Sequence, residues 1–108
     1  MSRVKITTFV PSTHADAVRE ALGKVGAGQL GEYSFCSFTV LGTGRFLPSS
    51  SAAPFIGEAE QHETVEEERI EVVCERDIAK TAIAAMKAVH PYEEVAFDIV
   101  SLLEESDL

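Results

Sequence analysis

Residues 88–100, AVHPYEEVAFDIV, place several chemically versatile side chains between two apolar runs. His90 can transfer a proton or bind a metal near neutral pH, Glu93 can act beside it as an acid or base, and Tyr92 can bury its ring while its hydroxyl forms a hydrogen bond. A structural role explains the same residues, because Pro91 cannot continue a helix and His90 would then lie at a helix C-terminus. The stretch is therefore either a ligand or metal site, or the end of a helix.

The stretch LGTGRFLP, residues 41–48, is a second candidate. Gly42 and Gly44 could present backbone N–H groups to an anion, and Arg45 could add the charge of its guanidinium. The stretch lacks both the G-x-G-x-x-G pattern that opens a helix in dinucleotide-binding proteins and the G-K-[ST] ending of a Walker loop. The alternative is that the glycines form a bulge or a tight turn and that Arg45 pairs with a carboxylate.

A third candidate is HETVEEER, residues 62–69, in which one histidine and four glutamates could bind a divalent cation. His62 and His90 are thus the candidate metal ligands, although a charged run ahead of a strand is also typical of a solvated sheet edge. Cys36 and Cys74 have no CxxC spacing, and each lies in an apolar run, so we interpret both as small buried hydrophobic residues. No Ser–His–Asp set is indicated by spacing.

The elements that must position these residues follow from hydrophobic periodicity. Alternating apolar residues predict strands over 3–10, 32–41, 67–75 and 95–102, and apolar residues at helical spacing predict helices over 13–25 and 78–89. The connection at about 43–66 is rich in Gly, Pro and Ser, so we predict a long loop there. This order predicts an α+β fold: a ferredoxin-like βαββαβ sandwich over 1–108, one domain, with a four-stranded antiparallel sheet and two helices on one face.

The predicted sheet carries apolar side chains on both faces, although two helices can cover only one. In the second strand, Cys36, Phe38 and Val40 alternate with Tyr33, Phe35 and Leu41. Each large apolar side chain left in water forgoes roughly 1.5–3 kcal/mol of burial. We therefore expect a second subunit, or another partner, to cover the second face. The alternative is that the long loop folds back over it.

Charge and composition exclude several classes of function. Nine basic and eighteen acidic residues give a net charge of −9, and the basic residues are scattered, which argues against nucleic-acid binding. No apolar run is long enough to span a membrane, and the N-terminal MSRVKITTFV has no apolar segment typical of a signal peptide. We expect a cytoplasmic protein.

Taken together and in order, GTGRFLP, EERIEVV and AVHPYEEVAFDIV resemble the PII/CutA-like domain inserted in YqfO-type proteins of the NIF-three (NGG-one-interacting factor) family, which also occurs as a free-standing small protein. The resemblance covers nearly the whole chain and is densest over 42–100, and the HPYE segment is also similar to CutA proteins. It implies a ferredoxin-like fold that associates through its sheet, often as trimers, with a mobile, partner-contacting loop between the second and third strands. Full-length NIF-three proteins have a dimetal centre in flanking domains that this sequence lacks, so the resemblance does not support a hydrolase or cyclohydrolase activity here.

The resemblance also selects a set of motif residues: Gly42, Gly44, Arg45, Pro48, Glu68, Arg69, His90, Pro91, Tyr92, Glu93 and Asp98. We predict a ligand site formed by Gly42, Gly44, Arg45, Phe46, His90, Tyr92 and Glu93, with His90 and His62 as ligands of a divalent metal ion if one is bound. The favoured function is a non-catalytic small-ligand-binding or regulatory module that forms a homo-oligomer, with a trimer favoured, and binds a small molecule or an anion. The alternatives are a divalent-metal-binding protein, an accessory subunit of a metal-dependent hydrolase, and an enzyme that uses His90 as acid or base with Glu93 or Asp98.

Overall fold

The computed structural model describes residues 2–108. The strands are β1 (Arg3–Pro11), β2 (Phe38–Phe46), β3 (Glu63–Glu75) and β4 (Phe97–Ser101), and the α-helices are α1 (Ala15–Lys24) and α2 (Ala79–Val89). Short 3-10 helices at Ser12–His14 and Arg76–Ile78 lead into the two α-helices, and a third covers Glu105–Asp107. None of the helices in residues 2–108 is long and apolar enough to cross a membrane.

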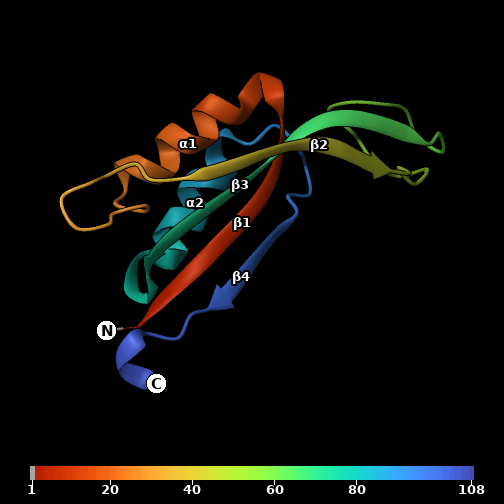
Figure 1. The fold of residues 1–108 in the computed structure, drawn as a ribbon. Helices are drawn as coiled ribbons and strands as arrows, with labels where there is room; N and C mark the ends of the chain where they lie inside the picture. Colours follow the sequence, from red (N-terminus) through yellow and green to blue (C-terminus); the bar gives the residue numbers. More distant parts are fainter. Residues whose placement is uncertain (1) are drawn as a thin grey trace.

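The four strands form one antiparallel sheet in the order β2-β3-β1-β4, and both α-helices pack on the same face of it (Figure 1). Alternate residues of the central strands point toward the helices and form the core: Val4, Ile6, Val10, Ile70, Val72 and Cys74. Burial raises the pKa of the Cys74 thiol, which supports its interpretation as a small hydrophobic residue. The predicted ferredoxin-like arrangement is confirmed.

The second strand begins later than the predicted 32–41. Residues before Phe38 form turns instead, in which Gly31 and Phe35 have φ angles of 57° and 58°. A positive φ at Phe35 breaks the two-residue alternation on which the predicted faces of this strand depended. Its ring packs over α1 at Gly23, where an added Cβ would lie 2.0 Å from the ring. Tertiary packing therefore overrides the strand-like composition of this segment.

The same strand also continues further, through the glycines that we predicted to lie in a loop. Gly42 pairs with Glu67 and Phe46 pairs with Glu63, so β2 and β3 form a long hairpin, and residues 47–62 alone connect them. Pairing along this ladder satisfies the backbone hydrogen-bonding groups, which outweighs the low strand propensity of glycine. In Figure 1 the hairpin projects past the helices, and the molecule measures 49 × 26 × 23 Å along its principal axes.

Arg19 of α1 connects the helical layer to the base of this hairpin. Its Nη1 atom donates hydrogen bonds to the carboxylate of Glu68, at 2.7 Å, and to the hydroxyl of Thr39, at 3.2 Å. Its Nη2 atom donates to Asp16 on its own helix. The motif residue Glu68 is thus engaged on the helix-covered face of the sheet, where it fixes the hairpin relative to α1.

Within residues 2–108, no layer covers the other face of the sheet. Phe38, Val40 and Val100 are roughly half or more exposed on this face. They lie among charged side chains, since Glu71 forms ion pairs there with Lys5 and with Arg69. The 47–62 connection leaves these residues uncovered, which contradicts the alternative that the loop folds back over the whole face. The face is mixed, with apolar side chains between ion pairs.

Candidate functional site

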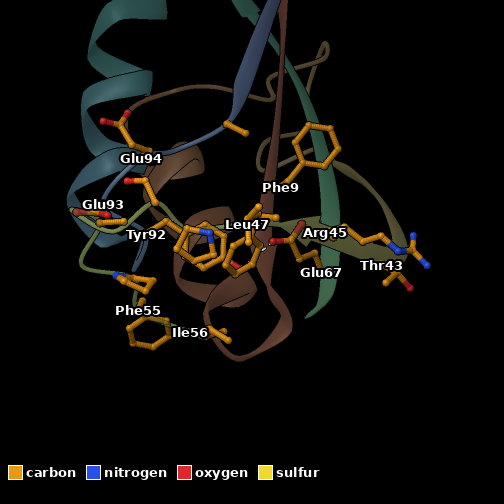
Figure 2. Close-up of a pocket in the computed structure, with 17 residues that line it drawn as sticks. Phe9, Thr43, Arg45, Leu47, Phe55, Ile56, Glu67, Tyr92, Glu93 and Glu94 are labelled. Atoms are coloured by element: carbon orange, nitrogen blue, oxygen red, sulfur yellow. Dashed lines mark hydrogen bonds between the residues drawn. The ribbon is translucent and has the colours of Figure 1, made fainter. Parts of the chain in front are cut away.

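A cavity of about 730 Å³ lies where three segments meet: the end of β2, the connection at 47–62, and the segment between α2 and β4 (Figure 2). Four aromatic side chains contribute to its walls, namely Phe9, Phe46, Phe55 and Tyr92. Its charged residues are Arg45, Glu67, Glu93 and Glu94. The volume and the mixture of apolar walls with a few polar groups are typical of small-molecule sites.

The base of the cavity contains a hydrogen bond between Tyr92 and Glu67. The Tyr92 hydroxyl donates to Glu67 Oε2 at 2.7 Å, a bond shown as a dashed line in Figure 2. Burial, helped by this hydrogen bond and by the negative charge of Glu67, raises the pKa of Tyr92 well above its ordinary value. The phenol therefore stays protonated at neutral pH and acts as a hydrogen-bond donor.

Gly44 leaves space for the Glu67 carboxylate, which lies directly against it. A Cβ built on Gly44 would be 2.1 Å from Glu67 Oε1, a distance that no side chain can adopt without moving the carboxylate. The same test at Gly42 finds open space. Of the two glycines in the GTG motif, Gly44 therefore makes room for Glu67, and it does so with an ordinary extended backbone.

The 47–62 connection is attached to the HPYEE segment at defined points. Glu93 Oε1 accepts a hydrogen bond from the backbone N–H of Ala53 at 2.9 Å. The Phe55 ring meets the edge of His14, with 5.3 Å between ring centroids. Within the connection, the N–H of Glu60 donates to the carbonyl of Pro48 at 2.7 Å. These contacts hold residues 47–56 over the cavity as one of its walls.

His90 lies behind the cavity and is only 7% exposed. Its Nε2 atom is 2.8 Å from the carbonyl oxygen of Phe9, and its Nδ1 atom is 3.2 Å from the backbone nitrogen of Tyr92. A carbonyl can only accept and an N–H can only donate, so Nε2 carries the proton and Nδ1 accepts. Burial lowers the pKa of His90, which keeps the ring neutral. Both nitrogens are engaged, and the ring joins β1 to the HPYEE segment.

The structure brings together most of the predicted ligand-site residues, although not all. Those that line the cavity are Gly44, Arg45, Phe46, Tyr92 and Glu93. Gly42 instead lines a neighbouring cavity of about 430 Å³ on the hairpin. His90 supports the segment from behind.

The predicted metal ligands are not assembled into a metal site. Within residues 2–108, no group of three or more His, Cys, Asp or Glu side chains could hold a metal ion. His62 is exposed in the 47–62 connection and does not line the main cavity. His90 has no nitrogen free to coordinate an ion, because both nitrogens are hydrogen-bonded.

Sequence reasoning missed several residues of the cavity, among them Glu67, Phe9 and Phe55. Glu67 lies in the charged run 62–69, for which the sequence leaves both cation binding and a solvated sheet edge open, and none of the sequence motifs includes Phe9. Of these residues, only Glu67 could have been found from the sequence, because pairing of GTGRF with the acidic run in a β-hairpin would place a carboxylate beside a glycine. The motif residues Arg69 and Asp98 line a separate, smaller cavity on the open face of the sheet.

Comparisons of sequence identify clear relatives, although no family model matches the chain. A "GTP cyclohydrolase 1 type 2 homolog" of Halalkalibacterium halodurans is 46% identical over 106 residues, which is 98% of this chain and 28% of the relative. The protein of the same name in Bacillus subtilis is 48% identical over 95 residues, or 88% of this chain and 26% of the relative. The chain therefore spans only about a quarter of the length of the curated relatives that it matches.

Comparisons of structure agree with the sequence. A Bacillus cereus protein related to NIF3 superposes with a TM-score of 0.82 at 45% identity, over 95% of this chain and 26% of that protein. The divalent ion tolerance protein CutA1 of Ehrlichia chaffeensis has a TM-score of 0.67 at 15% identity, over 97% of this chain and 85% of that one. The GlnK–ATP complex of B. subtilis has a TM-score of 0.64 at 12% identity, over 94% of this chain and 82% of that one. The last two likenesses show a shared fold.

Proposed function

We propose that this chain, a NIF3-like domain with the fold shared by CutA and GlnK, acts as a non-catalytic, oligomeric module that binds a small molecule and has a regulatory role. The observation that carries the proposal is the 730 Å³ cavity, which combines aromatic walls with a small number of placed polar groups. The names of the longer relatives describe whole proteins, and the proposal for this chain rests on its own cavity.

The chemistry of the cavity supports binding over catalysis. General acid–base catalysis at neutral pH requires a group that can gain and lose a proton near the substrate. Tyr92 has a raised pKa and donates to Glu67, and His90 is committed to two backbone groups behind the cavity. The serines near the entrance, Ser49 and Ser51, are bonded to each other at 3.2 Å. This arrangement favours holding a ligand over transforming it.

The wall formed by residues 47–56 gives such a module a means of signalling. Its contacts with the rest of the fold are few, and the Glu93–Ala53 hydrogen bond is exposed. A ligand between Tyr92 and Phe55 would contact both the HPYEE segment and this wall. Occupation of the cavity would therefore order or displace the connection, and a binding partner could recognise the difference.

Oligomer formation is the second half of the proposal, with a homotrimer favoured. It is supported by Phe38, Val40 and Val100, which are exposed on a sheet face that no other element of the described part of the chain covers. Ion pairs of Glu71 with Lys5 and Arg69 lie between them, and such mixed surfaces are common where subunits dock. A small cytoplasmic module that associates in this way would place several copies of the cavity in one assembly.

The experiment that tests ligand binding is a thermal-shift screen of water-soluble metabolites against three forms of the protein. Ala52 lines the cavity, so Ala52→Trp should fill part of it, whereas Ala59 is exposed in the same connection and does not line it. We expect a true ligand to raise the melting temperature of the wild type and of Ala59→Trp and to leave Ala52→Trp unchanged. The same compound should remain intact by mass spectrometry. Equal shifts in all three proteins, or consumption of the compound, would contradict the proposal.

A further inference from the structure

The charge of the cavity wall points to one class of ligand. Three carboxylates, those of Glu67, Glu93 and Glu94, line the cavity together with a single guanidinium, that of Arg45. In Figure 2 the Arg45 guanidinium points away from Tyr92, toward Thr43. The charge next to the aromatic rings is therefore negative, which disfavours the anionic ligand suggested by the Gly-Arg motif.

Glu67 differs from Glu68 and Glu71 of the same strand, which have cationic partners. Glu68 pairs with Arg19, and Glu71 pairs with Lys5 and Arg69. Glu67 is also partly buried, yet across residues 2–108 it forms no salt bridge, and its hydrogen bond comes from the neutral Tyr92 hydroxyl. A partly buried carboxylate is stabilised by a positive charge, so this group would gain most from a cationic ligand.

The aromatic side chains beside Glu67 suit the same ligand. The Phe46 and Tyr92 rings lie 6.2 Å apart, centroid to centroid, at an interplanar angle of 59°, and Phe55 also lines the cavity. The faces of aromatic rings attract cations, and more strongly where water is excluded. Carboxylates and aromatic rings therefore line the same cavity. Both attract a positively charged group, and the rings also favour an apolar body.

We infer that the cavity binds a small organic cation, a primary amine or guanidinium on an apolar body, with its N–H groups donating to Glu67 and its body against Phe46, Tyr92 and Phe55. This inference rests on the proposed function and specifies its ligand class. Glu67 Oε2 remains bonded to Tyr92, and Oε1 is the oxygen that receives the ligand. Gly44 leaves the space in which the carboxylate sits against β2.

The test uses three probes of one shape: 2-phenylethylamine, 2-phenylethanol and 3-phenylpropanoate, which are cationic, neutral and anionic at neutral pH. Binding is followed by amide chemical-shift changes in NMR titrations of the full chain. Because a hydrogen bond to a charged group contributes more than one to a neutral group, the amine should bind at least about tenfold more tightly than the alcohol. The anionic probe, 3-phenylpropanoate, should bind most weakly. The shifts should map to residues 43–56 and 92–96.

Two charge-neutralising variants make the test specific. Glu67→Gln keeps a side chain of the same shape, which can still accept from Tyr92, and it should weaken amine binding by about tenfold. Glu66→Gln removes the same charge from the adjacent position, whose side chain lies at the neighbouring cavity, and it should change the affinity by less than about twofold.

The possible outcomes separate this inference from the proposed function. If 3-phenylpropanoate binds in the cavity as tightly as the amine, or if Glu67→Gln leaves amine binding intact, the ligand class is wrong while a ligand site remains. If none of the probes produces saturable shifts at the cavity, the inference fails, and the thermal-shift screen with Ala52→Trp decides the proposed function separately. Preferential amine binding that depends on Glu67 supports both.

Discussion

Replacing His90 with alanine should destabilise the fold and should not act by removing a metal or catalytic group. The imidazole is buried and satisfies two backbone groups, the Phe9 carbonyl on β1 and the Tyr92 N–H in the HPYEE segment. In the His90→Ala variant, both groups lose their hydrogen-bonding partner. The end of α2 would no longer be attached to β1 at this level of the sheet.

The magnitude follows from these contacts. An unsatisfied buried backbone group costs about 1–3 kcal/mol, and water entering the vacated space would keep each of the two near the lower figure. The lost packing of the imidazole adds about 1 kcal/mol. We therefore expect a total loss of about 3 kcal/mol in the free energy of unfolding, and a melting temperature lower by about 12 °C.

Urea unfolding monitored by circular dichroism, at one fixed protein concentration, measures this loss. His62→Ala is the matched control, since His62 is exposed and its removal should change stability by less than about 0.5 kcal/mol. If His90→Ala unfolded at the same urea concentration as the wild type, the structural role assigned to His90 would be refuted. If His62→Ala proved as destabilising as His90→Ala, a shared metal site would become the better explanation.

The pH dependence of stability provides an independent check on the same residue. Burial holds the folded pKa of His90 below its ordinary value of 6.5, so between these two values the unfolded chain binds more protons than the folded chain. The contribution of His90 to the free energy of unfolding is therefore fully present above pH 6.5, and it decreases as the pH falls through the folded pKa. The difference in the free energy of unfolding between the wild type and His90→Ala should be smallest at the acidic end of this range.

Three further predictions concern the cavity and the open face. Gly44→Ala should push the Glu67 carboxylate away and cost about 1 kcal/mol through loss of the Tyr92 hydrogen bond, measured by urea unfolding. Tyr92→Phe should cost about 1 kcal/mol for the same reason, and in an alkaline absorbance titration it should remove the tyrosine that ionises above the usual range. Phe38→Glu should dissociate the oligomer, detected by sedimentation velocity, because a charge would replace an exposed ring of the proposed interface.

Two of these predictions, those for Gly44 and Phe38, have a control within the chain. Gly42→Ala introduces the same methyl group into open space and should leave Glu67 in place. Leu103→Glu adds the same charge at an exposed residue outside the sheet and should leave assembly unchanged. Equal effects of both glycine substitutions, or a wild type that sediments as a single 11.7 kDa species, would contradict the reasoning.

The fold could be predicted from the sequence wherever apolar residues alternate strongly. Val4 and Ile6 in β1, and Ile70 and Val72 in β3, gave an unambiguous strand period, and their burial agrees with it. Residues 32–37 could not be predicted in this way. Their composition is typical of a strand, but tertiary packing decides their conformation and places Phe35 in the left-handed region over Gly23.

The site was predicted where its residues are close in sequence and missed where pairing between strands brings them together. Tyr92 and Glu93 belong to one short motif, so their side-chain types alone marked them. Glu67 lies 25 residues from Tyr92, and only the register of β2 with β3 places it against Gly44. The role of His90 depends on a carbonyl 81 residues away, and no local pattern could distinguish that role from metal binding.

Strand β3 carries both the cavity floor and the core, on opposite sides of a single stretch of chain. Glu67 faces the cavity, whereas Ile70 and Val72, which lie three and five positions further along the strand, face the helices. Inserting or deleting one residue between Glu67 and Ile70 would exchange the two sides and send the carboxylate toward the core. Homologues that use this cavity can therefore vary the chemistry of its walls freely, while the spacing from Glu67 to Ile70 must stay constant.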